Sequence, residues 1–176
     1  MKLRQLFLFF LVFLFSINIS IIKAEEKIAF IDLNIIFDNS KAGKEIIQKV
    51  QKIQKNNSNE LSKLKKKFDK DREDLKKQKN VLSEDEYKKK FFQLDKNVKE
   101  YNLLVNKKNS ETTNFQLKAR SQFYNKLTPI LETYAKENSI SIILKKENIL
   151  IGKTDLDISK DILDLFDKNV KKITVK

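Results

Sequence analysis

The middle of the sequence repeats apolar residues at the spacing of two long helices. Sustained steps of three and four residues over this length are typical of coiled-coil helices. The first run comprises Ile46, Val50, Ile53, Leu61, Leu64, Phe68, Leu75 and Leu82, and the second comprises Tyr87, Phe91, Leu94, Val98, Tyr101, Val105, Phe115, Ala119, Phe123, Leu127, Ile130 and Tyr134. With only two glycines and one proline, the chain lacks the turn residues that a sandwich or barrel of many hairpins needs.

A short turn near Val81–Ser83 joins the two runs. Ser83 and Glu86 fit a capping box, and acidic Glu84 and Asp85 suit the positive first turn of the second helix. A short connection between two apolar-striped helices makes an antiparallel hairpin. In the first helix the 3-4 spacing of the apolar residues shifts phase at residues 56–59. Four seam positions are polar and predict a weak, mobile seam: Asp71, Gln78, Lys108 and Thr112.

The first 24 residues have the layout of a secretory signal peptide. Basic Lys2 and Arg4 precede 17 uncharged residues, and small Ala24 then stands before Glu25. We therefore expect an exported chain, with cleavage after Ala24. The alternative is an uncleaved anchor, because 17 residues approach the roughly 20 that span a bilayer. Polar residues in the second half of the segment favour cleavage.

The positive charge is concentrated in the predicted hairpin. The whole chain carries 37 Lys and Arg against 24 Asp and Glu, and residues 41–126 alone carry 24 against 12. In a cytosolic protein this balance would first suggest nucleic acid. For an exported chain the anionic partners are instead acidic protein surfaces, lipopolysaccharide or an anionic membrane surface, and we expect no nucleic-acid binding.

The composition argues against an enzyme. The chain has no histidine and no cysteine, so it lacks the commonest zinc ligands, thiol catalysis and the Ser-His-Asp triad. Gly43 and Gly152 cannot form a glycine-rich phosphate loop. The carboxylate pairs Asp71/Asp74 and Asp155/Asp157 are expected to be solvated faces or helix caps. We therefore expect no catalytic residues, no metal site and no cofactor.

The ends of the mature chain are β-rich. Apolar runs at 27–33, 140–144 and 149–151 predict three strands, and the last two suit a hairpin. A helix is expected from about Lys160 to Lys172 with Ser159 as its N-cap. Pro129 should start a fresh helical segment or kink the second helix. These features divide the chain into a signal peptide (1–24), a β-rich oligomerisation body (25–40 and 128–176) and a helical arm (41–127).

Three short strands with one small helix cannot enclose much core. We therefore expect the body to need other chains, with the helical hairpin projecting from it. The fold class is mostly α, with a long antiparallel helical hairpin on a small β-rich oligomeric base. The residues expected in the oligomerisation body are Ile28, Phe30, Ile31, Ile142, Leu144 and Leu150.

The whole mature chain resembles the Skp/OmpH family of periplasmic chaperones. The resemblance is carried mainly by residues 27–33 and by 127–166, which include Leu127-Thr128-Pro129-Ile130 and Gly152-Lys153-Thr154-Asp155. It implies a homotrimer with a small β-barrel-like base, in which three helical tentacles surround a cavity and hold unfolded outer-membrane proteins without ATP. Some members have a proposed lipopolysaccharide site built from basic residues, and no positions here match it.

One helix face is the candidate surface for a client protein. Phe92 and Leu103 lie 11 residues apart, about three full turns, and Leu117 falls near the same line. This face points away from the predicted seam and is bordered by Lys88, Lys96 and Lys99. Two other interpretations stay open, namely scattered surface hydrophobes and contact with a neighbouring arm.

The expected function is that of an ATP-independent periplasmic holdase for unfolded outer-membrane proteins. The alternative is a coiled-coil spacer or stalk of the cell envelope that binds no client. A spacer favours a stiff, uninterrupted seam and has no need of basic arms. The polar seam positions and the charge of residues 41–126 therefore favour the chaperone.

The signal-peptide assignment predicts that the mature chain begins at Glu25. Intact mass and N-terminal peptides of protein from the envelope fraction would measure this directly. Recovery of the intact Met1 segment in the membrane pellet would instead show an anchored protein.

Overall fold

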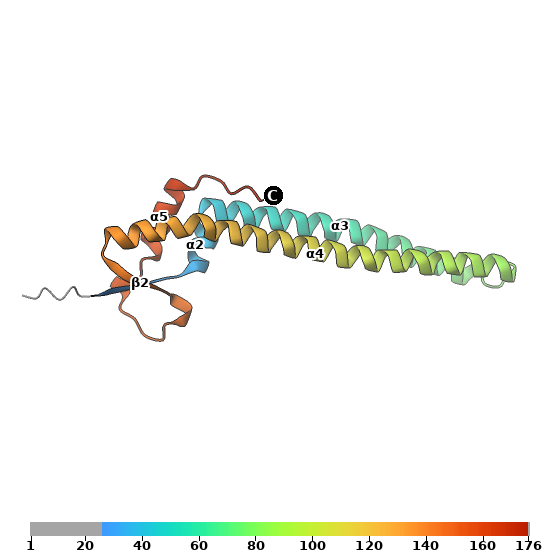
Figure 1. Cartoon of the computed structure of the whole chain (residues 1–176). Coiled ribbons are helices and arrows are strands. Elements are labelled where there is room, and N and C mark those ends of the chain that lie inside the picture. The colour runs from blue at the N-terminus through green and yellow to red at the C-terminus, as the bar shows by residue number, and fades with distance from the viewer. Residues whose placement is uncertain (1–25, 176) are drawn as a thin grey trace, which may run out of the picture.

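The structure is a computed structural model and describes residues 26–175. The signal peptide and the cleavage site after Ala24 lie outside the described residues. Figure 1 shows a small base from which one long helical hairpin projects. The described part is mostly helical, and its one sheet has two strands. None of its helices is long and apolar enough to cross a membrane.

The chain enters the base through strand β1 (Lys27–Ile31) and then turns into the short helix α2 (Leu33–Asn39). The strand expected over 27–33 stops at Ile31 because Asp32 caps the helix. The Asp32 carboxylate accepts hydrogen bonds from the backbone N–H groups of Asn34 and Ile35, both at 3.0 Å. This is the ordinary role of aspartate at a helix N-terminus.

Ser40 joins α2 to helix α3 (Lys41–Gln78). Its N–H donates to the Ile36 carbonyl at 3.0 Å, and its Oγ accepts from the N–H of Gly43 at 3.1 Å. A Cβ at Gly43 would collide with the carbonyl of Phe37. Only glycine therefore fits where the end of α2 meets the start of α3.

Helix α4 (Glu84–Glu137) returns antiparallel to α3 and completes the arm (Figure 1). The predicted capping box is confirmed, since Ser83 Oγ accepts from Glu86 N–H and Glu86 Oε2 accepts from Ser83 N–H. The fresh segment expected at Pro129 is wrong, because α4 continues through it. Pro129 and Asn125, whose carbonyl loses its helical partner, both lie on the exposed side of the helix.

The sheet pairs β1 in parallel with β2 (Ile140–Lys145), with Ile28 beside Ile142 and Phe30 beside Leu144. The third strand expected at 149–151 does not form in the described chain. Residues 146–148 make a 3₁₀ turn instead. The chain then continues to the other side of β1, where an isolated bridge joins Phe30 to Asp157.

Helix α5 (Ser159–Asn169) closes the base. Ser159 was expected to be its N-cap, but it is the first helical residue and has another use. Its Oγ accepts from the N–H of Asp32 at 2.8 Å and donates to the carboxylate of Asp157. Ser159 therefore ties α5 to the junction between β1 and α2.

The core of the base forms around Phe123 of α4. Its ring lies 4.9 Å from that of Phe37 and 4.5 Å from that of Phe166, and Phe123 and Phe166 are fully buried. Our expectation that the chain ends need other chains to enclose a core is wrong. Ile46 of α3 and Leu127 of α4 also belong to this core. Both lie within residues 41–127, the segment that we assigned to the arm.

Asp157 links the loop after β2 to the start of α5. Its Oδ2 accepts from Lys146 Nζ at 2.7 Å, and its Oδ1 accepts from the N–H of Ser159 at 3.0 Å. Burial alone would raise the pKa of Asp157, but the hydrogen bonds from Lys146 and Ser159 outweigh it and hold the pKa below its ordinary value. The folded base therefore favours the ionised carboxylate.

We predict that Asp157→Asn lowers the free energy of unfolding by about 1.5 kcal/mol at pH 7, because a charged acceptor is lost. The folded pKa of Asp157 lies below the unfolded value, about 3.9. The contribution is therefore complete above about pH 5 and is lost as the pH falls through the folded pKa. Urea titrations of both proteins should show a difference in the free energy of unfolding that shrinks as the pH falls toward about 2.

Asp155, which is exposed two residues earlier, supplies the matched control. The Asp155→Asn variant should stay within about 0.5 kcal/mol of the parent chain at every pH. If the loss of unfolding free energy in Asp157→Asn stayed the same in acid, the stabilisation would not come from the ionised Asp157 carboxylate.

Candidate functional site

The arm presents the candidate surface, and its shape depends on how α3 and α4 pair. The Phe68 and Tyr101 rings meet edge to face across the seam, with centroids 5.7 Å apart. Leu75 is 7% exposed, whereas most other seam residues of the outer arm are half-buried. Outside the base the apolar seam is therefore thinly covered.

Two polar contacts cross the middle of the arm. Lys108 Nζ lies 2.7 Å from Glu60 Oε2, and the Lys108 side chain is only 20% exposed. Asn57 Nδ2 donates to Thr112 Oγ1 at 3.2 Å. The polar seam positions 108 and 112, from which we expected a weak and mobile seam, thus have partners on the opposite helix. The partners come from the phase shift at 56–59 and its immediate neighbourhood.

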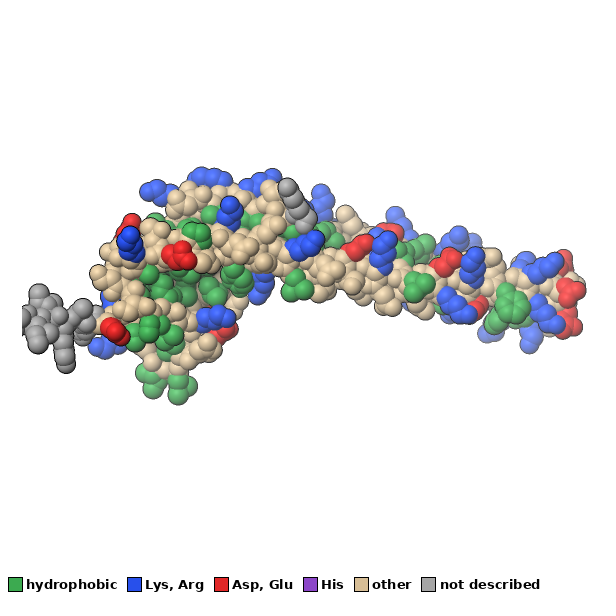
Figure 2. Space-filling view, viewed as in Figure 1, with side chains coloured by type: hydrophobic (Ala, Val, Ile, Leu, Met, Phe, Trp, Pro, Cys, Tyr) green, Lys and Arg blue, Asp and Glu red, His purple; other side chains and the backbone are tan. Residues whose placement is uncertain are grey.

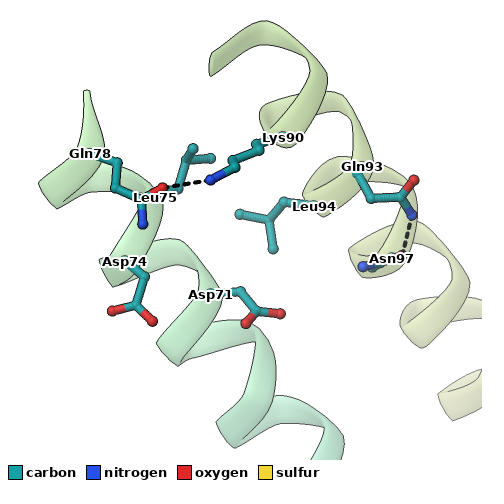
Figure 3. A pocket seen from close by; sticks show the side chains of 8 residues that line it. All are labelled: Asp71, Asp74, Leu75, Gln78, Lys90, Gln93, Leu94 and Asn97. Carbon is teal, nitrogen blue, oxygen red and sulfur yellow. Dashed lines mark hydrogen bonds between the residues drawn. The ribbon is translucent and has the colours of Figure 1, made fainter. Parts of the chain in front are cut away.

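Nearer the tip, the seam opens into a polar cavity of about 260 Å³ (Figure 3). Leu75 and Leu94 face each other there. Lys90 Nζ donates to Gln78 Oε1 at 2.7 Å and so links the two helices. The full lining is Asp71, Asp74, Leu75, Gln78, Lys90, Gln93, Leu94 and Asn97. Here the polar seam positions 71 and 78 take the place of apolar contact between the helices.

The three apolar residues of the candidate face are all exposed on α4. Phe92 is 68% exposed, Leu103 69% and Leu117 63%. Their exposure agrees with a face that points away from the seam. We call these three residues the apolar stripe.

The lysines chosen beside the apolar stripe are exposed, and each lies near an acidic side chain one helical turn away. Lys88 Nζ is 2.6 Å from Glu84, Lys99 Nζ is 2.7 Å from Asp95, and Lys96 Nζ is 3.9 Å from Glu100. Exposed pairs of this kind contribute little to stability. Their charges stay available to a partner, although the acidic neighbours reduce the local field. Figure 2 shows basic side chains along the whole arm, with acidic ones between them and at the tip.

Sequence reasoning placed Phe91 in the seam, and this is wrong. Phe91 is 52% exposed, and its ring lies edge to face with that of Phe92 at 6.2 Å. The C-terminal end of α3, which faces this part of α4, carries polar residues such as Gln78 and offers Phe91 no apolar pocket. These polar residues of α3 are the sequence feature from which the exposure of Phe91 could have been predicted. Phe91 extends the exposed apolar surface beside the apolar stripe.

Where the arm meets the base, a groove of about 640 Å³ lies between α3 and α4. Its apolar lining includes Ile47, Val50 and Leu117, and Gln51, Gln54 and Gln116 add side-chain amides. Leu117 therefore belongs both to the apolar stripe and to the groove. No local sequence pattern indicates this groove, because residues from two distant segments form it.

The residues that we expected in the oligomerisation body fall into two groups. Phe30 and Ile31 are 6% and 3% exposed, so this chain buries them itself. Four others remain exposed: Ile28 (43%), Ile142 (45%), Leu144 (42%) and Leu150 (97%). Ile28 and Ile142 are neighbours across the sheet. Among residues 26–175, no group of three or more acidic side chains is placed to hold a metal ion.

Comparisons with known proteins give one family and one fold. Residues 27–166 match the family model described as Outer membrane protein (OmpH-like). A crystal structure from Caulobacter crescentus, of a proposed outer membrane chaperone (OmpH-like), superposes with a TM-score of 0.77 at 17% identity. The alignment covers 86% of this chain and 89% of that one. No curated protein matches the sequence.

Proposed function

Because the chain belongs to the family of OmpH-like outer membrane proteins, which are not enzymes, we propose that it is an ATP-independent holdase chaperone of the periplasm. In this proposal several basic arms surround a cavity. Unfolded outer-membrane proteins bind there and are kept from aggregating before they insert.

The observation that carries this proposal is the exposed apolar stripe on a long basic helix. Apolar side chains that stay about two-thirds exposed on a folded protein are available to an apolar partner. The excess of 24 basic over 12 acidic residues in 41–126 favours an acidic partner. Unfolded chains that are both apolar and acidic fit this surface.

A structural spacer is the second candidate, and the polar contacts across the arm favour it. The pair Glu60–Lys108 and the hydrogen bond from Asn57 to Thr112 fix the register of α3 against α4. Fixed register suits a stiff rod. The exposed apolar stripe has no use in a rod, so we prefer the chaperone.

We further propose that the arms are brought together in a homotrimer through the sheet. In the described residues β2 pairs only with β1, so its outer edge is open. Ile28, Ile142 and Leu144 form an exposed apolar area beside that edge. Leu150 and Ile151, 97% and 91% exposed, extend it. An unpaired edge with exposed apolar neighbours is suited to contact with a different surface of a neighbouring chain, and such a head-to-tail contact repeated three times closes a ring.

This interface predicts that Ile142→Asp combined with Leu144→Asp dissociates the trimer, because an unpaired charge in the interface costs several kcal/mol. Light scattering would give the mass, and circular dichroism should show unchanged helix content. Phe92→Asp on the arm is the matched control and should stay trimeric. Phe30→Asp is unsuitable, because Phe30 is buried within its own chain. A monomer in the unmutated protein would refute the trimer.

The chaperone proposal predicts that an acidic unfolded barrel protein associates more slowly as salt rises. The reason is that the Debye length falls from about 10 Å at 0.1 M to about 3 Å at 1 M. Replacing Phe92 and Leu103 with serine should instead raise the dissociation rate and leave the thermal midpoint unchanged, since both are exposed. Stopped-flow fluorescence with a labelled client and no nucleotide measures both rates.

Val81→Ser is the matched control, because Val81 is 82% exposed at the turn but lies off the apolar stripe. It should leave both rates unchanged. An association rate that is indifferent to salt would remove the role of the arm charge. A chain that neither binds the client nor prevents its aggregation would favour the spacer.

A further inference from the structure

An extended segment follows α5, and we call residues 170–175 the strap. Val170 is 8% exposed, and Ile173 and Val175 are half-buried against the core cluster. Lys172 and Thr174 between them are exposed. The outer part of the strap thus alternates inward apolar with outward polar side chains, as a β-strand does. It lies beyond residue 166, where the match to the family model ends.

The strap is anchored at its start only. The N–H of Lys41 donates to Asp167 Oδ1 at 2.8 Å, and the N–H of Val170 donates to the Phe166 carbonyl at 2.7 Å. Among the described residues, no hydrogen bond joins 171–175 to the rest of the chain. From that anchor the strap runs toward the arm (Figure 1), and it packs against the core cluster to which α3 contributes Ala42, Ile46 and Val50. Apolar side-chain contacts alone hold its outer part in place.

The strap and the start of α3 carry net charges of the same, positive sign. The strap contains Lys171 and Lys172 and no acidic residue. The first 20 residues of α3, residues 41–60, contain five lysines and two glutamates. Like charges on the two sides weaken the contact at low salt. An extended segment with the same alternation but with acidic outward residues would complement the surface better.

We propose that the surface beneath the strap binds extended client segments in which apolar and acidic side chains alternate, and that the strap is a displaceable internal competitor for it. This proposal rests on the proposed holdase function and names a second contact site at the base of the arm. Sequence-tolerant apolar contacts suit a client without a fixed fold. An internal competitor lowers the apparent affinity by the fraction of time for which the site is open.

The test is a chain that stops after Val170, which removes the strap beyond its anchor and leaves α5 complete. The probe is a synthetic, labelled peptide with alternating leucine and glutamate, and fluorescence anisotropy gives its affinity. A strap that is closed about nine-tenths of the time predicts about tenfold tighter binding after truncation. Ile173→Ser combined with Val175→Ser in the full chain should act in the same direction.

A charge reversal should act in the opposite direction. Lys171→Glu combined with Lys172→Glu gives the strap the acidic character that the surface prefers, so we expect weaker binding of the peptide. Lys153→Glu combined with Lys168→Glu makes the same change of net charge outside the strap, on two exposed residues. The strap variant should lose more affinity than this control.

The outcomes separate the two proposals. If the full chain binds an unfolded barrel protein while neither truncation nor the serine variant tightens the peptide, the strap is not a competitor and the holdase function stands. Weaker binding after truncation would also overturn the strap proposal. If no form of the chain binds any client, the holdase function itself fails.

Discussion

The packing of Phe123 against Phe37 and Phe166 is the contact on which the rest of the molecule depends. These three rings come from α4, α2 and α5, so one buried cluster joins the arm to both ends of the chain. Phe123 is fully buried, and truncation of such a residue costs about 3–5 kcal/mol. Ser159 and Asp157 then tie the loops around this cluster with hydrogen bonds. The thinly covered arm can project because its inner end is fixed here.

Much of the fold could be predicted from local sequence, because helices carry their signals locally. The 3-4 spacing gave the two helices of the arm, and Ser83 with Glu86 gave the start of α4 correctly. The failures involve partners distant in sequence. The 149–151 strand is absent because residues 146–148 form a 3₁₀ turn and the chain then continues to the other side of β1, where Asp157 bridges Phe30. Pro129 is tolerated because its side of α4 faces solvent. Neither fact can be read from the residues nearby.

In the candidate site, too, the features that depend on local sequence were predicted and those that depend on distant segments were not. Helical periodicity was enough to predict that Phe92, Leu103 and Leu117 share one exposed line. It could not pair Lys108 with Glu60, because the relative register of two helices depends on both sequences at once. The groove beside Leu117 and the surface beneath the strap likewise need segments that are far apart in the chain. Local patterns therefore found the face of one helix, while the surfaces made by several elements required the structure.

The junction at Ser40 makes the arm a lever. One buried serine ends α2 and begins α3, and Gly43 packs closely against the Phe37 carbonyl, so α3 joins the base through only a few residues. Helix α3 has 38 residues, which is about 57 Å at 1.5 Å per residue. A rotation of about 5° at the joint would move the tip of such a helix by about 5 Å. A rotation at this joint, for example through repacking around Phe37, would therefore move the tip more than an equal bend farther out along the arm.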